Sequence, residues 1–289
     1  MQHNLKDKVC LITGASSGIG RICASSFARM GAELWLLCRN REKGEHTVEN
    51  IIQQSGNDNI HLLHGDLSSL NQVRNVAHTF LEHDRPLHLL LNNAGVFNIK
   101  QKLTVDNNEE MFAVNHLAHF LLTNLLLDRI KASAPARIVN IASDAHWFCN
   151  SINFNDLKFE KKFKTFKTYG HSKLANILFN QELAKRLRGT GVTANALHPG
   201  GFGIKTGLGM QNGWVTNLFA MFMNPFLQTA EQGAETSIYV CTSDELGGVT
   251  GSYFKNCRKV AAKPWATDDK ASLQLWQISE KLTSLAWYL

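Results

Sequence analysis

The sequence predicts an α/β protein: one doubly wound domain built on a parallel sheet of about seven strands. Short apolar runs alternate with longer amphipathic runs along all 289 residues, as in repeated β-α-β units. No linker, repeat or low-complexity tract divides the chain. A hydrophobic content of 44% with 19% charged residues is enough for one large core. Residues 1–289 are therefore expected to form a single domain.

The expected elements alternate in order along the chain. Apolar runs of strand length, typical of parallel strands buried on both faces, occur at 9–15, 33–39, 60–67, 87–94, 137–143, 192–198 and 251–254. Amphipathic segments fill the gaps and predict helices near 18–30, 41–54, 69–83, 109–132, 168–189, 229–243 and 268–284. This order places helices on both faces of the sheet.

A glycine-rich turn follows the first strand. Glycines permit a tight turn and close backbone approach, and the following helix N-terminus presents free N–H groups to a pyrophosphate. A loop without a ligand is the alternative, but the position between a strand and a helix favours the nucleotide site. The predicted phosphate-binding residues are Gly14, Ser16, Ser17, Gly18, Ile19 and Gly20.

The residue after the second strand predicts the nucleotide. NAD-binding folds usually place an acid about 20 residues past the glycine turn, where it accepts hydrogen bonds from the ribose. Here Arg39, Asn40 and Arg41 stand at that point, with no carboxylate. An arginine is suited to a 2′-phosphate, and such a charge-assisted pair contributes about 1.5–3 kcal/mol. We therefore expect Arg39 to favour NADPH over NADH.

Tyr169 and Lys173 are spaced by one helical turn, so their side chains share one face of the predicted helix. A lysine charge beside a phenol favours the phenolate and lowers the pKa of the tyrosine, which can then act as a general acid or base. An ordinary polar helix face has the same spacing. The other motifs decide between a catalytic pair and an ordinary polar helix face.

Composition excludes several classes of function. The net charge of +6 is modest, and we find no Lys/Arg block or aromatic-interleaved basic patch that would indicate nucleic acid. Six scattered cysteines and 12 histidines show no metal-ligand spacing. The longest uncharged stretch, 206–230, is interrupted by glycines, polar residues and a proline, so no integral membrane span is predicted. We expect a soluble, cytoplasmic protein, with peripheral membrane association and homo-oligomers left open.

Taken together, the glycine turn and Tyr169-x-x-x-Lys173 resemble a short-chain dehydrogenase/reductase with a single Rossmann-type domain. The similarity covers nearly the whole chain. Asp66-Leu67 is similar to the family's adenine-contacting acid, and Asn93-Ala94-Gly95 belongs to a motif similar to its fourth-strand motif. His198-Pro199-Gly200 resembles the turn beside the nicotinamide, which adds Pro199 and Gly200 to the expected NADP(H) site.

The same resemblance implies four catalytic residues: Asn115, Ser143, Tyr169 and Lys173. Ser143 would hydrogen-bond the substrate oxygen while Tyr169 donates a proton to it during carbonyl reduction. Lys173 would lower the phenol pKa and hold the nicotinamide ribose, and Asn115 would support a water in the proton relay. Alternatively, Ser143 could cap a loop and Asn115 could satisfy backbone groups in a helix kink.

Within the family, the chain is most similar to retinol dehydrogenase-like members, on the run from Tyr169 to Asn176, residues 182–187 and Gly251-Ser-Tyr-Phe. Membrane-bound members often carry an N-terminal anchor, and we expect none here. The family's nicotinamide-contacting threonine is displaced, because Thr206 lies two residues too far from Pro199. A light-dependent protochlorophyllide-type reductase, for which Cys149 leaves room, and a non-catalytic nucleotide-binding scaffold are the alternatives.

The substrate is expected on the far side of the nicotinamide turn, where residues 204–228 would cover it. This segment is rich in aromatic and methionine side chains: Trp214, Leu218, Phe219, Met221, Phe222, Met223, Phe226 and Leu227. Such side chains line apolar, adaptable pockets, although core packing or a subunit contact explains them equally well. We expect a lipophilic aldehyde or ketone, or the corresponding alcohol.

Overall fold

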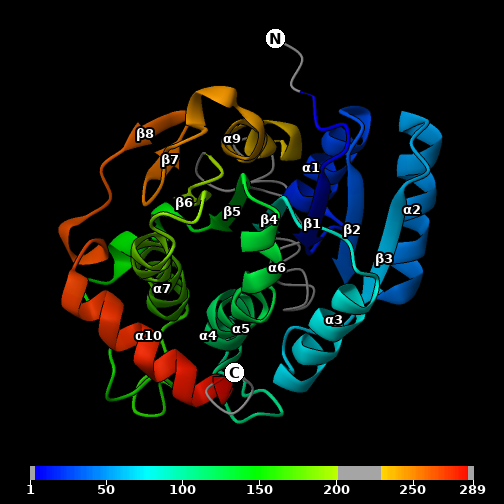
Figure 1. The fold of residues 1–289 in the computed structure, drawn as a ribbon. Coiled ribbons are helices and arrows are strands. Elements are labelled where there is room, and N and C mark those ends of the chain that lie inside the picture. Colours follow the sequence, from blue (N-terminus) through cyan, green and yellow to red (C-terminus); the bar gives the residue numbers. More distant parts are fainter. Residues whose placement is uncertain (1–3, 201–228, 286–289) are drawn as a thin grey trace.

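The computed structural model describes residues 4–200 and 229–285. Its centre is one eight-stranded sheet in the order β3-β2-β1-β4-β5-β6-β7-β8 (Figure 1). The first seven strands are parallel and are β1 (Val9–Thr13), β2 (Glu33–Cys38), β3 (Ile60–His64), β4 (Leu89–Asn92), β5 (Ala136–Ile141), β6 (Val192–Leu197) and β7 (Tyr253–Lys255). The doubly wound α/β fold is confirmed.

The eighth strand was not predicted. β8 (Arg258–Val260) runs antiparallel to β7, and Phe254 pairs with Lys259. The two strands are joined by Asn256 and Cys257, which both have positive φ, 50° and 56°, as a two-residue type I′ hairpin requires. Three largely polar residues carry no apolar alternation, so this strand is not visible in the sequence pattern.

Helices cover both faces of the sheet. Side chains of β1 alternate between two apolar cores: Cys10 and Ile12 face one, and Leu11 faces the other. The first core includes residues of α1 (Gly18–Arg29), α2 (Arg41–Ser55) and α9 (Ala230–Thr242). The second includes residues of α3 (Leu70–Glu82), α5 (Ala118–Leu125), α6 (Leu127–Ala132), α7 (Thr165–Arg186) and α10 (Asp269–Thr283).

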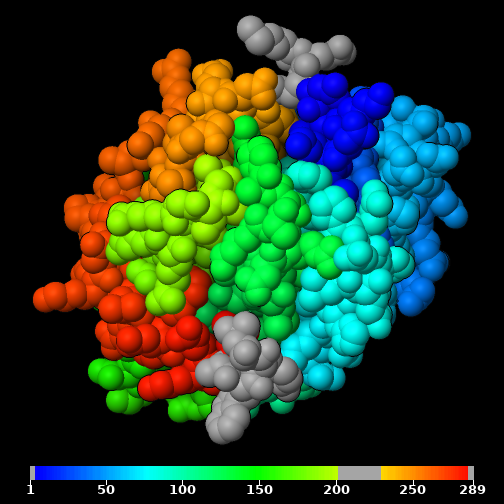
Figure 2. Space-filling view, viewed as in Figure 1, coloured from blue at the N-terminus to red at the C-terminus, as the bar shows by residue number. Residues whose placement is uncertain are grey.

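In the space-filling view the N-terminal elements and the C-terminal elements flank the green central segments (Figure 2). Burial on both faces explains why the β1 sequence Val-Cys-Leu-Ile-Thr lacks polar alternation. Within residues 4–200 and 229–285, no helix has both the length and the apolar character that a bilayer crossing needs. The predicted covering segment 204–228, with Thr206, lies outside the described residues.

The helix predicted over 109–132 is interrupted. A short α4 (Glu110–Phe112) passes into a π-helical turn, Ala113–Leu117, before α5 begins, and α6 follows after Leu126. The buried carboxylate of Glu109 caps α4 by accepting from the N–H groups of Met111 and Phe112. π-turns are often found at functional sites, and this one contains Asn115.

Candidate active site

The glycine turn packs directly against the end of β4. A Cβ atom added to Gly20 would come closer than 3.0 Å to the Gly14 carbonyl oxygen and to Asn93 Nδ2, and one added to Gly14 would lie 2.8 Å from Ala94 Cα. Gly14 also has φ +68°, a conformation that favours glycine. These close approaches explain why glycine occupies both positions.

The N-terminus of α1 is suited to an anion. Its N-cap residue, Ser17, makes no side-chain capping bond among the described residues, and no acidic residue stands in the first turn. The first N–H groups of the helix and its dipole are therefore available to a phosphate group. The residues predicted from the sequence as the phosphate turn thus fit a dinucleotide.

The adenosine side of the predicted site lies at the ends of β2 and β3. Arg39 follows β2 with an exposed side chain, while its carbonyl oxygen is 3.1 Å from His64 Nε2. Asp66 Oδ1 accepts from the N–H of Ser68, and Leu67 is buried. A cavity of about 290 Å³ beside the turn is lined by Ser16, Ser17, Gly18, Arg21, Ser25, Lys43, His46, Thr47, Asn50, Ile51 and Gln54.

The Thr13 hydroxyl fixes the protonation of a buried histidine. Thr13 Oγ1 accepts from the N–H groups of Asn93 and Ala94, both at 2.9 Å, which uses its two lone pairs. Its own proton must then go to His119 Nε2, 2.9 Å away. The proton of the neutral ring therefore sits on Nδ1, which donates to the carbonyl oxygen of Asn115 at 3.1 Å. Burial, above all, lowers the pKa of His119 to about 4, which keeps the ring neutral.

Asn115 is held at three points. Its Oδ1 accepts from Val96 N–H at 2.7 Å, and its Nδ2 donates to the Val96 carbonyl oxygen and to Ser172 Oγ at 3.1 and 2.9 Å. Ser172 Oγ in turn donates to the carbonyl oxygen of Tyr169 at 2.7 Å. The side chain of Asn115 thus ties the π-turn to the segment after β4 and to α7, and the backbone groups that it satisfies belong to Val96 rather than to the helix kink.

Lys173 lies close to Asn115, beside Gly95. Its Nζ donates to the Ile141 carbonyl oxygen at 3.1 Å and lies 5.7 Å from the centroid of the Tyr169 ring. A Cβ on Gly95 would lie 3.3 Å from Asn115 Oδ1 and 3.7 Å from Lys173 Nζ. Gly95 is therefore the point at which these two predicted catalytic side chains meet.

The expected lowering of the Tyr169 pKa is not what this geometry gives. Burial raises the pKa of Tyr169 well above its usual value, and burial lowers the pKa of Lys173 to about 8. The Lys173 ammonium, 5.7 Å from the ring centroid, does not offset the loss of water around the phenol. The phenol is therefore firmly protonated at neutral pH.

Ser143 lies opposite, directly after β5. It is the N-cap of the short 3-10 helix Asp144–Phe148, where its Oγ accepts from Ala145 N–H at 3.1 Å. This helix packs tightly on α7, because Gly170 is the contact residue: a Cβ there would come closer than 3.0 Å to the Ala145 carbonyl oxygen. Ser143 thus caps this 3-10 helix, and the contact at Gly170 holds the helix against the turn of α7 that carries Tyr169.

A polar cluster centred on Asp144, which the sequence pattern did not reveal, holds the turn His198-Pro199-Gly200 that was predicted to lie beside the nicotinamide. Asp144 Oδ2 accepts from Lys255 Nζ at 2.6 Å and lies 3.7 Å from His198 Nε2, and Asp144 Oδ1 accepts from Tyr253 Oη at 3.2 Å. Asp144 therefore links the end of β5 to β7 and to the buried His198-Pro199-Gly200 turn. Only the three-dimensional arrangement shows this link, since Lys255 is 111 residues away in sequence.

Aromatic rings line the approach to Tyr169. The ring of Phe97 lies 5.2 Å from that of Tyr169 and 5.6 Å from that of Phe166, which is 5.8 Å from Phe148. By contrast, the thiol of Cys149 is buried, and burial raises its pKa to about 12. This thiol stays protonated at neutral pH.

Sequence reasoning also overlooked a basic and aromatic segment. Residues 158–167 contain five lysines and three phenylalanines, contrary to the statement that the chain has no aromatic-interleaved basic patch. The signal is plain in the sequence Lys-Phe-Glu-Lys-Lys-Phe-Lys-Thr-Phe-Lys.

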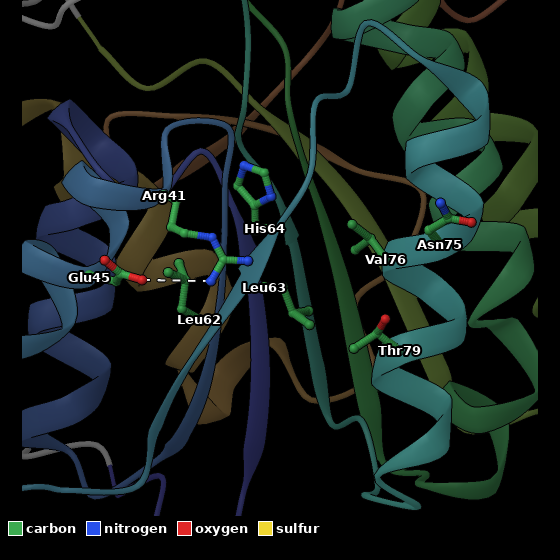
Figure 3. Close-up of a pocket in the computed structure, with 8 residues that line it drawn as sticks. All are labelled: Arg41, Glu45, Leu62, Leu63, His64, Asn75, Val76 and Thr79. Carbon is green, nitrogen blue, oxygen red and sulfur yellow. Dashed lines mark ion pairs between the residues drawn. The ribbon is translucent and has the colours of Figure 1, made fainter.

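A second cavity lies away from this site. It has a volume of about 340 Å³ and is flanked by α2, the edge strand β3 and α3 (Figure 3). Arg41 and Glu45 form an ion pair of 3.7 Å on one wall, and Val76 and Thr79 stand on the other. None of the predicted catalytic residues lines it. In the described part of the chain, no group of histidine, cysteine and acidic side chains could hold a metal ion.

The sequence pattern of the short chain dehydrogenases matches residues 8–213. This match, with the geometry above, decides the family. The chain is a short-chain dehydrogenase. Such enzymes are oxidoreductases that use NAD(P), and the earlier resemblance is confirmed.

Two groups of known proteins are similar over nearly the full length. Mouse (Mus musculus) retinol dehydrogenase 12 is 41% identical over 97% of this chain and 87% of its own. Human (Homo sapiens) retinol dehydrogenase 14 is 40% identical, covering 96% and 87%. An uncharacterised protein from Mycobacterium paratuberculosis superimposes with a TM-score of 0.78 at 30% identity, covering 98% and 95%. The NADP complex of Pseudomonas aeruginosa RhlG, at 23% identity, shares the fold with a TM-score of 0.68, covering 91% and 98%.

Proposed function

We propose that this short-chain dehydrogenase uses NADPH to reduce a lipophilic aldehyde or ketone, with oxidation of the alcohol as the reverse reaction. The observation that carries the proposal is the convergence of Asn115 and Lys173 on Gly95. Tyr169 and Ser172 stand on the same turn of α7, and Ser143 lies across the Gly170 contact.

The glycine turn fits the cofactor. Gly14 and Gly20 leave no room for a side chain, and the uncapped N-terminus of α1 can receive the pyrophosphate. Lys173 would hold the nicotinamide ribose. When bound, the nicotinamide would supply the hydride for the carbonyl carbon.

The protein groups would orient the substrate and move one proton. Ser143 Oγ would donate a hydrogen bond to the carbonyl oxygen, and Tyr169 Oη would transfer its proton to that oxygen as negative charge develops. Burial raises the pKa of Tyr169, so the phenol carries its proton at neutral pH and gives it up only as negative charge develops on the substrate oxygen. The positive charge of Lys173 would stabilise the phenolate that remains.

Positive charge at the adenosine end supports NADPH. Arg39 follows β2 with an exposed guanidinium. The cavity beside the glycine turn contains two more cationic side chains, Arg21 and Lys43. An arginine would hold a 2′-phosphate by charge-assisted hydrogen bonds, whereas NADH offers no such group.

Two observations support a lipophilic substrate. The relatives at 40–41% identity are named for retinol, a lipophilic alcohol. In addition, Phe97, Phe148 and Phe166 form a ring cluster that reaches Tyr169. Aromatic side chains of this kind suit an apolar chain rather than a small polar carbonyl.

The proposal is tested by following NADPH consumption with a panel of carbonyl compounds. We expect long-chain and isoprenoid aldehydes to give the highest kcat/KM, and Tyr169→Phe to abolish most turnover with NADPH affinity retained. Higher kcat/KM for small polar carbonyls would contradict the substrate class. Full activity of Tyr169→Phe would contradict the role of the phenol.

A further inference from the structure

Six of the seven large exposed apolar side chains of the described residues lie in three segments, 99–105, 147–148 and 158–167. Val105 is 84% exposed, Phe166 62% and Trp147 53%. Leu103, Ile99 and Phe148 are also exposed, and Leu273 on α10 is the one large exposed apolar side chain elsewhere among residues 4–200 and 229–285. Contiguous exposed apolar side chains on a folded protein often mark an interaction site.

Three separate segments form this surface, and side-chain contacts join them. The ring of Phe166 lies 5.8 Å from that of Phe148. Thr165 Oγ1 donates to the Ile99 carbonyl oxygen at 3.2 Å, and Gln101 Nε2 donates to the Lys158 carbonyl oxygen at 2.7 Å. We call residues 99–105, 147–148 and 158–167 the basic-aromatic surface.

The surface is strongly positive. Within 158–167 five lysines stand against the single acid Glu160. Lys161, Lys162 and Lys164 are exposed, and no ion pair of the described residues involves any of the five. Beyond the segment, Lys263 Nζ lies 4.8 Å from the centroid of the Trp147 ring. The lysine charges therefore remain available to an external anion.

The segment is anchored to the protein. Phe159 is buried, with its ring 5.0 Å from that of His171, and Phe163 packs against the core. Asp156 accepts from the backbone N–H of Glu160 at 2.9 Å and of Lys161 at 3.4 Å. The inward phenylalanines fix the backbone, so the lysines are presented from an ordered surface.

We propose that the basic-aromatic surface docks on an anionic phospholipid bilayer. Lysines near such a bilayer are attracted to its acidic headgroups, and their apolar stems allow the ammonium groups to reach them. Trp147, Phe166 and Val105 would enter the interface, where tryptophan and other amphipathic or apolar side chains are favoured. This property goes beyond the proposed reaction, because binding to a bilayer requires no turnover.

The composition favours a bilayer over nucleic acid. All the cations of the surface are lysines, which suit acidic phospholipid headgroups. Leu103 and Val105 are aliphatic and cannot stack on bases. Docking here would also place the ring cluster of Phe97, Phe166 and Tyr169 beside the membrane. A lipophilic substrate could then reach the site without crossing water.

The test measures sedimentation of the full chain with vesicles of pure phosphatidylcholine, or of equal parts phosphatidylcholine and phosphatidylserine. The wild type should bind the anionic vesicles, and binding should weaken with added salt. The triple variant Lys161→Glu/Lys162→Glu/Lys164→Glu should lower the partition coefficient by about a hundredfold or more, since each lost lysine weakens it by about fivefold.

A matched triple variant separates location from net charge. Lys6→Glu/Lys270→Glu/Lys281→Glu changes three exposed lysines elsewhere and lowers the net charge of +6 by the same six units. This control should bind nearly as the wild type does. Val105→Ser should weaken binding several-fold and Leu273→Ser should not, because only the first lies on the surface.

Three results would overturn the proposal: no binding of the wild type to anionic vesicles, equal loss in both triple variants, or loss of oligonucleotide binding in the surface triple with vesicle binding unchanged. NADPH affinity, measured in parallel, shows that the variants are folded. A water-soluble aldehyde assayed without vesicles should be turned over equally by wild type and surface triple. The proposed reaction and the docking can thus fail separately.

Discussion

Gly170 offers the sharpest test of how the active site is assembled. In Gly170→Ala the new Cβ would approach the Ala145 carbonyl oxygen closer than 3.0 Å, a separation that real Cβ atoms essentially never show. The Ala145 carbonyl carbon and Phe148 Cβ would both stand at 3.3 Å, so the methyl group has no free side to turn to. The 3-10 helix must therefore retreat from α7 by more than half an ångström.

That retreat separates Ser143 from Tyr169. A misplacement of about 1 Å in an active site costs about a hundredfold in rate, so kcat should fall by roughly ten- to a hundredfold. Overpacking should lower the free energy of unfolding by about 1–3 kcal/mol. NADPH affinity should stay close to that of the wild type, because the glycine turn is not touched. Steady-state kinetics, NADPH titration and thermal unfolding measure the three quantities.

Gly248→Ala is the matched control. A Cβ on Gly248 meets nothing within 4 Å, and its φ is outside the positive range that strains other residues. Its kcat should equal that of the wild type. Its free energy of unfolding should match the wild-type value to within about 0.5 kcal/mol. If Gly170→Ala keeps wild-type kcat, the tight contact between the 3-10 helix and α7 does not position the reacting groups.

Four further outcomes are expected. Tyr169→Phe should lower kcat by about a hundred- to ten-thousandfold and change the NADPH Kd little. Arg39→Asp should weaken NADPH binding by about ten- to a hundredfold and leave NADH binding unchanged or stronger; an unaltered preference in a two-nucleotide titration would argue against Arg39 as the phosphate partner. Asp144→Asn should loosen the nicotinamide turn and raise the KM for NADPH more than it lowers the free energy of unfolding, as kinetics beside chemical denaturation would show. His119 has a native pKa of about 4 against 6.5 when unfolded, so the unfolded chain binds more protons and up to about 3 kcal/mol of stability is lost as the pH falls from 6.5 to 4. In His119→Gln that acid slope should be shallower, and an identical slope would refute the buried neutral ring.

Much of the fold is readable because each parallel strand is a continuous apolar run. Val9 to Thr13 is buried at every position, so the core on both faces leaves a clear signal. β8 leaves none, since Arg258, Lys259 and Val260 form one short edge ladder with β7. The π-turn at Asn115 is also invisible to periodicity, because its cause is a set of long-range hydrogen bonds.

The residues of the candidate site also differ in whether the sequence reveals them. Residues on local motifs, such as the glycine turn and Tyr169 with Lys173, were predicted from spacing. Asp144 and His119 were not, because their roles come from partners more than 100 residues away, Lys255 and Thr13. The Tyr169 pKa was predicted in the wrong direction, since spacing reports the nearby charge but not the burial of the phenol. The lysines of 158–167 were present in the sequence and simply overlooked.

The central claim is that Tyr169 supplies the proton when this chain reduces a lipophilic carbonyl with NADPH. A single-turnover experiment tests it: enzyme saturated with NADPH is mixed with a long-chain aldehyde, and loss of reduced nicotinamide is followed. The wild type should oxidise one NADPH per site, and Tyr169→Phe should bind NADPH equally well yet react at least about a hundredfold more slowly. Equal rates in the two proteins would contradict the claim.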